Sequence, residues 1–350
     1  MKTPANETET AIISRKKPAY PITKGLRHYL RHYKREVAIP CRYEDLRRYH
    51  FAMPLLDQQG CDTLWETVYY SDTDRDEIHL ALTTIYAILK AAGDTSVMKH
   101  LFVDRIDYCT FGNSNPFRVR IVNKFNDNYD YFYVKTADAS RIYGLELEHI
   151  LSPNRINYIA FDQTLIEEHI AGIPGDRFMA EYLTKPPINE TRIAKEFIKF
   201  NERCLVKLLG DMRAYNFVID ITPDFDDIQY RIRAIDFDQQ CYESRKNLYL
   251  PQYFKENLPL VNLCIKRITP ESVRQYQHEE RALMTHRLIS SKAQVKELLG
   301  AMSHEILSTD EKTAQLRSEL AQYYQNTAFE RCQTMGEIVK TSLWAVLLGK

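Results

Sequence analysis

The sequence lacks any excess of charge: its 350 residues include 47 basic and 47 acidic side chains, so the formal net charge at pH 7 is zero. Proteins dedicated to nucleic-acid binding usually carry a basic excess, and this class is therefore disfavoured. No apolar run approaches the roughly eighteen residues of a membrane-spanning helix, and we expect no transmembrane segment. The polar start, Met1 to Thr10, has no apolar core of a signal peptide, and no internal repeat stands out.

Cysteine is present but lacks a pattern. The seven cysteines are odd in number, scattered, and never spaced as Cys-x-x-Cys. This disfavours a zinc centre and a secreted disulfide scaffold, and it favours a reducing compartment. We therefore expect a cytoplasmic protein that forms two domains or one two-lobed domain at this length.

The most informative segment predicts a β-hairpin. Residues 217–220 and 230–235 read as short strands, and residues 222–227 between them are rich in turn formers. A hairpin returns the chain beside its start. We therefore expect Asp236 to lie near Asn216 despite twenty residues of separation.

Asp211 precedes this hairpin by a short loop, which completes a set of three oxygen-bearing side chains. Phosphoryl transfer from ATP needs one carboxylate near the attacking hydroxyl and oxygen ligands that hold Mg²⁺ against the phosphates. Asp211 can supply the carboxylate, and Asn216 and Asp236 can supply the metal ligands. The alternative is an ordinary surface hairpin with solvated aspartates. In order and spacing, the segment resembles the catalytic core of the protein-kinase-like superfamily, and this resemblance extends over about residues 103–260.

Upstream residues extend the resemblance. Residues 131–135 form a strand-like run that ends in Lys135, and the helix-compatible residues 144–150 offer Glu146 and Glu148. In kinases a strand lysine contacts the α- and β-phosphates and is held by a helix glutamate. The resemblance implies these roles for Lys135 and for Glu146 or Glu148. The alternative is that Lys135 lies on a solvated strand edge.

Two further segments are similar to parts of the nucleotide site. Residues 157–175 resemble the two strands and hinge of small-molecule kinases, which implies that the backbone of Glu168 and Ile170 binds adenine, although a structural strand–turn–helix junction would look similar. Gly112, Asn113 and Ser114 fall where the phosphate-covering loop is expected. This loop has one glycine where kinases typically have three, so an inactive pseudokinase is kept as an alternative interpretation.

Three differences from the usual kinase motifs indicate which branch of the superfamily the sequence resembles. Leu209 stands where aminoglycoside phosphotransferase-like kinases have His, and Leu-Gly-Asp is closer to the phosphatidylinositol-kinase-like branch. Asp238 replaces the Gly of Asp-Phe-Gly, where it either assists magnesium or caps a loop. The Ala-Pro-Glu signature is missing, which disfavours a eukaryotic-type protein kinase.

The chain divides into three predicted parts. Residues 1–100 are expected to form a basic, mainly helical N-terminal extension, residues 101–170 a β-rich nucleotide-binding lobe, and residues 171–350 a helical catalytic lobe. Between residues 15 and 48, eleven Lys/Arg face three acids and are interleaved with tyrosines. This stretch is either a site for an anionic partner or the solvated face of helices whose tyrosines pack inward.

These observations predict an α+β, two-lobed, protein-kinase-like fold with a small antiparallel sheet lobe, a larger helical lobe and the N-terminal extension. The predicted activity is an ATP- and Mg²⁺-dependent phosphotransferase that moves the γ-phosphate to a hydroxyl. The acceptor is an unidentified small molecule, sugar, lipid or protein. The alternatives are a catalytically weak, nucleotide-sensing pseudokinase and a kinase-fold enzyme that transfers AMP.

Overall fold

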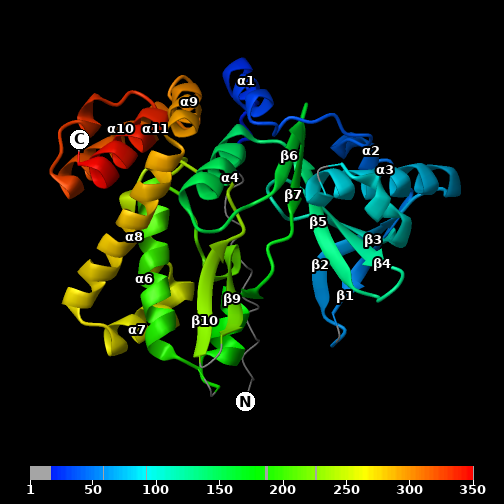
Figure 1. Cartoon of the computed structure of the whole chain (residues 1–350), viewed down its shortest axis with the longest axis horizontal. Coiled ribbons are helices and arrows are strands. Elements are labelled where there is room, and N and C mark those ends of the chain that lie inside the picture. Colours follow the sequence, from blue (N-terminus) through cyan, green and yellow to red (C-terminus); the bar gives the residue numbers. More distant parts are fainter. Residues whose placement is uncertain (1–16, 58, 92, 186–187, 225–226, 350) are drawn as a thin grey trace, which may run out of the picture.

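The smaller lobe is built on a seven-stranded antiparallel sheet with the strand order β1-β2-β3-β4-β5-β7-β6 (Figure 1). The computed structural model describes residues 17–349 except 58, 92, 186–187 and 225–226. The strands are β1 (Phe51–Leu56), β2 (Asp62–Tyr69), β3 (Leu101–Cys109), β4 (Phe117–Asn123), β5 (Tyr129–Thr136), β6 (Tyr158–Phe161) and β7 (Thr164–Glu168).

Two helices accompany this sheet. Helix α3 (Asp72–Ala91) packs its apolar residues, among them Leu82 and Ile85, into a core shared with β3, β4 and β5. Helix α4 (Ala139–Leu151) is buried along most of its length and joins the core of the larger lobe. Asp138 caps α4 by accepting a hydrogen bond of 3.1 Å from the Ser140 amide, which fixes where the helix begins.

The N-terminal region differs from the mainly helical extension that we expected. It contains α1 (Lys24–His32), the short α2 (Tyr43–Leu46) and α3, but β1 and β2 lie between them and continue the main sheet. Strand β2 pairs with β3, with Trp65 opposite Cys109. The expectation overlooked these strands because their apolar residues are partly exposed and give little periodic signal.

Most of the arginines in the basic N-terminal stretch form ion pairs. Arg27 and Arg31 contact Glu36 at 2.7 and 2.9 Å, and Arg35 contacts Glu146 at 2.6 Å. Tyr29 and Tyr43 are buried, at 1% and 5% exposure. These contacts favour the solvated helical face over a dedicated anion-binding surface, and the anionic partner stays a prediction.

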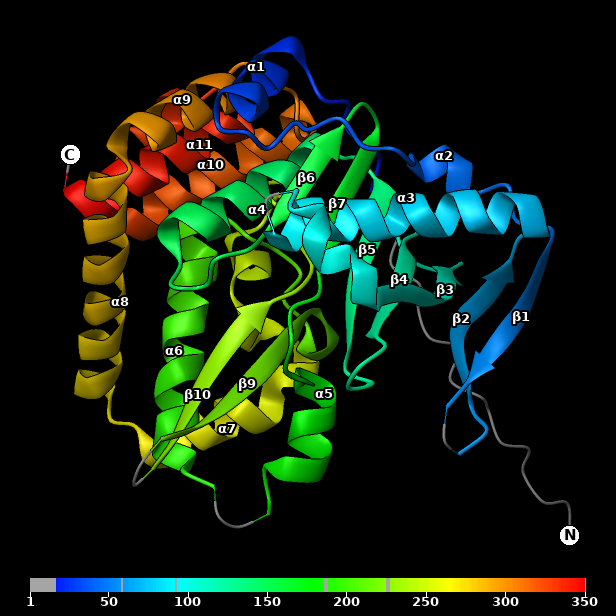
Figure 2. The same ribbon diagram turned by 45° about the vertical axis from the view of Figure 1, so that its right-hand side comes forward.

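The larger lobe is mainly helical and carries a second, three-stranded sheet (Figure 2). Its strands are β8 (Ile173–Pro174), β9 (Phe217–Asp224) and β10 (Asp227–Ala234). Its helices are α5 (Gly175–Arg177), α6 (Glu190–Lys207), α7 (Leu258–Arg267), α8 (Pro270–Ser290), α9 (Lys292–Met302), α10 (Asp310–Tyr324) and α11 (Met335–Ser342).

Short helical turns complete the elements. They lie at Thr95–His100, Phe178–Tyr182, Ala214–Asn216, Lys246–Tyr249, Pro251–Tyr253, Lys255–Asn257, Phe329–Arg331 and Leu343–Leu347. The two-lobed α+β architecture expected from the sequence is confirmed. Within the described part of the chain, no helix has the length and apolarity needed to cross a membrane.

Candidate functional site

The loop that carries Asp211 is held by backbone hydrogen bonds on both sides. Helix α6 ends at Lys207, and Leu208 turns the chain in the left-handed region with φ of 55°. The Gly210 amide then donates to the Gln239 carbonyl at 3.2 Å, and the Asp211 amide donates to the Leu248 carbonyl at 3.1 Å. Asp211 itself has φ of 56°, an uncommon conformation for a residue with a side chain, so the surrounding contacts must hold it there.

The Asp211 carboxylate is largely buried beside a single cation. Arg213 Nε donates to Asp211 Oδ1 at 2.9 Å, and a second guanidinium nitrogen of Arg213 contacts Glu256 at 2.6 Å. Burial raises the pKa of Asp211 to about 6, against the opposing effect of Arg213 and with a further increase from Asp236. A carboxylate with this pKa can accept a proton near neutral pH.

The predicted hairpin is confirmed, and it places Asp236 beside Asn216. Strands β9 and β10 pair Phe217 with Ala234, and the Ile235 amide donates to the Asn216 carbonyl at 3.0 Å. The Asn216 side-chain amide donates to the backbone carbonyl of Asp211 at 2.7 Å, which ties the two residues together. Asp211, Asn216 and Asp236 therefore gather at one end of the hairpin, although their chemical roles stay predictions.

The oxygen donors of Asn216 and Asp236 suit Mg²⁺ by their chemistry. Burial raises the pKa of Asp236, and the neighbouring charge of Asp238 raises it further. A bound cation would stabilise the ionised form of Asp236 and offset both effects. Over the residues that the structure covers, no group of three or more His, Cys, Asp or Glu side chains is arranged to hold a metal ion.

Lys135 does not pair with either glutamate that the resemblance implied. Its Nζ, on the buried end of β5, lies 2.9 Å from Oε2 of Glu167 on the adjacent strand β7. The lysine side chain is 9% exposed, so the alternative of a solvated strand edge is wrong. Burial lowers the pKa of Lys135, and the charge of Arg141 lowers it further.

Glu146 and Glu148 are engaged elsewhere. Glu146 accepts hydrogen bonds from Tyr29, Arg35 and Tyr158, at 2.8, 2.6 and 2.7 Å. Glu148 forms a buried ion pair with Lys207 at the end of α6. Both carboxylates therefore join α4 to neighbouring elements and are already satisfied, so the expected contact with Lys135 is wrong.

Arg141, which the sequence reasoning missed, connects the two halves of the site. Its guanidinium contacts Glu167 with two nitrogens, one of them at 2.8 Å from Oε2. Its Nη1 lies 2.8 Å from Asp236 and 2.7 Å from Asp238. Burial alone would raise the pKa of Glu167, but Arg141 and Lys135 outweigh it and lower the pKa to about 2.

A sequence signal for this cluster was available. Leu165 and Glu167 share one face of β7, and Arg141 lies near the beginning of a helix that is otherwise rich in apolar residues. A carboxylate or guanidinium on a buried face requires a partner of opposite charge. That rule would have pointed to a buried ion pair without identifying both partners.

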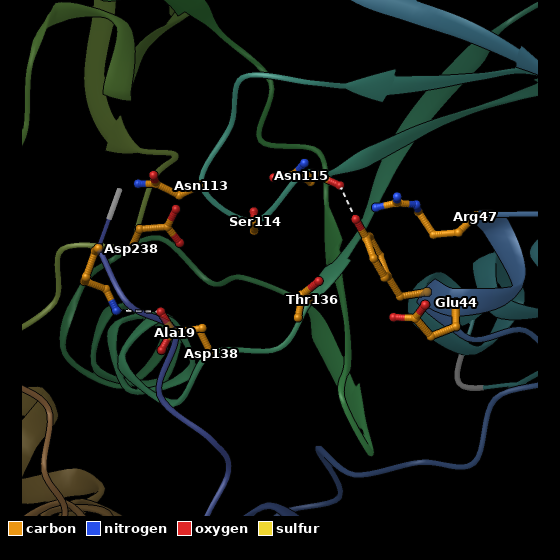
Figure 3. A pocket seen from close by; sticks show the side chains of 11 residues that line it. Ala19, Glu44, Arg47, Asn113, Ser114, Asn115, Thr136, Asp138 and Asp238 are labelled. Carbon is orange, nitrogen blue, oxygen red and sulfur yellow. Dashed lines mark hydrogen bonds and ion pairs between the residues drawn. The ribbon is translucent and has the colours of Figure 1, made fainter. Parts of the chain in front are cut away.

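The expected phosphate-covering loop connects β3 to β4, as the sequence indicated. Asn113 and Ser114 line a cavity of about 310 Å³ together with Thr136, Asp138 and Asp238 (Figure 3). Lys17 closes another part of this cavity with an ion pair of 2.5 Å to Asp138. Gly112 is not part of the lining, and a Cβ at its position would lie 3.1 Å from Pro116 and 3.4 Å from Cys109.

In the predicted hinge, one of the backbone groups expected to bind adenine is already hydrogen-bonded. Glu168 ends β7, and its amide donates to the Asn157 carbonyl at 3.1 Å. Of its two backbone groups, only the carbonyl is therefore left to form a hydrogen bond with adenine. Its carboxylate contacts Lys90 at 3.3 Å. Ile170 is buried and belongs to the core of the larger lobe.

Comparison with known proteins adds little to this geometry. No protein-family model and no curated protein matches the chain. Among solved structures 46 chains match, and one of them is the autoinhibited serine kinase domain of the giant muscle protein titin. That match has 12% sequence identity and a TM-score of 0.28, and it covers 70% of this chain and 92% of the other. A likeness this distant carries no argument about activity.

Proposed function

We propose that this protein is an ATP- and Mg²⁺-dependent phosphotransferase that moves the γ-phosphate of ATP to a hydroxyl group. The observation that carries the proposal is the gathering of Asp211, Asn216 and Asp236 at one end of the β9–β10 hairpin. Lys135 is connected to them through Glu167, which accepts hydrogen bonds from both Lys135 and Arg141, and Arg141 in turn contacts Asp236. The sequence order of Lys135, Asp211, Asn216 and Asp236 is also the order found in the family that the chain resembles.

The proposed reaction assigns a separate role to each residue of the site. Asp211 accepts the proton of the acceptor hydroxyl while the hydroxyl oxygen attacks the γ-phosphorus. The bond between the γ-phosphorus and the β–γ bridging oxygen breaks, which releases ADP. Arg213 positions the Asp211 carboxylate through its 2.9 Å contact. Asn216 and Asp236 would hold Mg²⁺, which when bound neutralises phosphate charge.

The remaining residues bind the nucleotide. Lys135 contacts the α- and β-phosphates, and the loop of Gly112, Asn113 and Ser114 covers them. The adenine lies against the hinge, where Ile170 and the carbonyl of Glu168 are the candidate contacts. The acceptor is a hydroxyl-bearing small molecule, sugar, lipid or protein.

A second candidate is a nucleotide-sensing pseudokinase. Arg141 occupies both Asp236 and Asp238 with one nitrogen, at 2.8 and 2.7 Å. A metal ion that binds Asp236 must therefore compete with a resident guanidinium. This arrangement favours weak catalysis if Arg141 stays in place.

Thermal unfolding with and without Mg²⁺-ATP tests the nucleotide site. A ligand at a hundred times its dissociation constant stabilises the folded state by about 2.7 kcal/mol, which raises the melting temperature by a few degrees. We expect this increase in the wild type and in Asp220→Asn, a control on β9 of the same hairpin, but not in Asp236→Asn. An unchanged melting temperature at millimolar Mg²⁺-ATP would refute the nucleotide site.

Labelled ATP then separates the candidate activities. Transfer of the γ-label to an acceptor supports the phosphotransferase, and Asp211→Asn should slow it by about 10²–10⁴-fold while nucleotide binding persists. Retention of the α-label in the product indicates AMP transfer instead. Nucleotide binding without transfer of either label supports the pseudokinase.

A further inference from the structure

A second cavity lies apart from the proposed nucleotide site, between α8 and the C-terminal end of α4. Its volume is about 540 Å³, within the range of small-molecule sites. The polar residues that matter for its chemistry are His149, Arg155, His286, Arg287, Ser290 and Ser291.

The lining of this cavity is cationic and contains no acidic side chain. Arg155 comes from the loop after α4, and Arg287 comes from α8. Among the residues that the structure describes, neither guanidinium has an ion pair or a side-chain hydrogen bond. Most other arginines of the described chain contact a carboxylate, whereas neither of these two does, and both line the same cavity.

We propose that this cavity binds a small phosphorylated molecule. A guanidinium group donates two parallel hydrogen bonds to phosphate oxygens, and two such groups match the charge of a phosphate dianion. His286 and Ser291 in the lining add further donors, whereas the Ser290 hydroxyl already donates to the His286 carbonyl at 3.0 Å. A bound phosphate would supply the negative charge that the protein itself does not place there.

The geometry favours a small molecule over nucleic acid. A nucleic-acid site needs an extended basic surface, whereas this chain has no net charge and its basic N-terminal stretch is largely ion-paired. Here two arginines line one half-open cavity of about 540 Å³. The ligand chemistry is a phosphate group, whether on a soluble metabolite or on a lipid headgroup.

This cavity and the proposed nucleotide site share one helix but no lining residue. His149 lies near the end of α4, and Arg141 lies eight residues earlier, near its beginning. Eight residues of α-helix correspond to about 12 Å. Ligands at the two sites can therefore be told apart by variants.

Calorimetric titration with inorganic pyrophosphate, in buffer of low salt with EDTA, tests the proposal on the full chain. We expect saturable binding to the wild type. Because a hydrogen bond to a charged group contributes about tenfold or more in affinity, Arg155→Ala/Arg287→Ala should weaken binding about a hundredfold. Arg274→Ala is the matched control, since Arg274 also lies on α8 but pairs with Glu271 outside the cavity.

Two further measurements keep the outcomes distinct. Arg287→Lys retains the charge and should keep part of the affinity, with circular dichroism as the check that each variant is folded. Asp236→Asn should bind pyrophosphate as the wild type does. Absence of saturable binding at millimolar pyrophosphate together with absence of vesicle binding, unchanged binding in the double variant, or loss of binding in Asp236→Asn would each overturn the proposal.

Vesicles of phosphatidylcholine with and without phosphatidylinositol 4-phosphate identify the source of the phosphate. Sedimentation of the wild type, but not of the double arginine variant, with the phosphorylated lipid supports the site and assigns a headgroup. Binding of soluble pyrophosphate alone supports the site and assigns a soluble ligand.

Discussion

Asp211 lies in a site that favours its protonated form, so replacing it with asparagine should stabilise the folded protein at neutral pH. Burial raises the pKa of this carboxyl from 3.8 to about 6. In the unfolded chain the same group ionises near its ordinary pKa. Between these two pH values the folded state therefore holds the proton more tightly than the unfolded state does, and stability falls as the pH rises.

The size of this effect follows from the two pKa values. They differ by about 2, and at 1.36 kcal/mol per pH unit the free energy of unfolding falls by about 3 kcal/mol between pH 4 and pH 7. The Asp211 side chain is 25% exposed, and screening by solvent reduces this value. We therefore expect the free energy of unfolding to fall by about 1–3 kcal/mol. Asparagine resembles the protonated carboxyl and does not ionise. The variant should therefore gain stability over the wild type as the pH rises.

Urea unfolding of Asp211→Asn and the wild type from pH 4 to pH 7.5 measures this difference. The two tryptophans, Trp65 in β2 and Trp344 near the C-terminus, report on different parts of the chain. If the unfolding transitions followed by tryptophan fluorescence and by circular dichroism coincide, unfolding is two-state and the free energies are well defined. Asp220→Asn on the same hairpin controls for the substitution itself. The reasoning is refuted if Asp211→Asn is no more stable than the wild type at pH 7.5, or if their difference does not grow with pH.

Two other predictions concern buried contacts around the site. Glu167→Gln removes the carboxylate that pairs with the buried Lys135 and leaves Arg141 with Asp236 and Asp238 alone. It should lower the free energy of unfolding by about 3–5 kcal/mol, whereas Glu168→Gln at the next position should change it by less than about 1 kcal/mol in the same urea assay. Equal effects would contradict the ion-pair assignment. Gly144→Ala would place a methyl group 3.0 Å from Phe237 and should cost about 1–3 kcal/mol, whereas Gly300→Ala meets nothing within 4 Å and should stabilise its helix by about 0.5–1 kcal/mol. Melting temperatures that move in the same direction would contradict this pair.

Features that depend on neighbouring residues could be predicted from the sequence. The hairpin from Phe217 to Ala234 has two short strands and a turn-rich connection, and its register then places Asp236 beside Asn216 by geometry alone. The strand that ends near Lys135 is likewise rich in β-branched and aromatic residues. Local chemistry therefore located the elements that carry the candidate site.

Features that depend on distant packing could not be predicted. The partner of Lys135 is Glu167, 32 residues away on another strand, because the faces of α4 that carry Glu146 and Glu148 turn toward other elements. No local pattern fixes how a helix is rotated about its axis. Strands β1 and β2 were missed for a related reason, since pairing with β3 and not their own composition gives them a place in the sheet.

If Asp236 holds Mg²⁺ as proposed, the position of Arg141 makes that binding an exchange of one cation for another. This guanidinium is covalently tethered beside Asp236, so it acts at a high local concentration and competes with any free ion for the same carboxylate oxygen. The same guanidinium also contacts Glu167 on β7 of the smaller lobe. Breaking its contact with Asp236 would therefore remove one contact between the two lobes. Occupation of the proposed metal site would therefore be coupled to the contact between the lobes through one side chain.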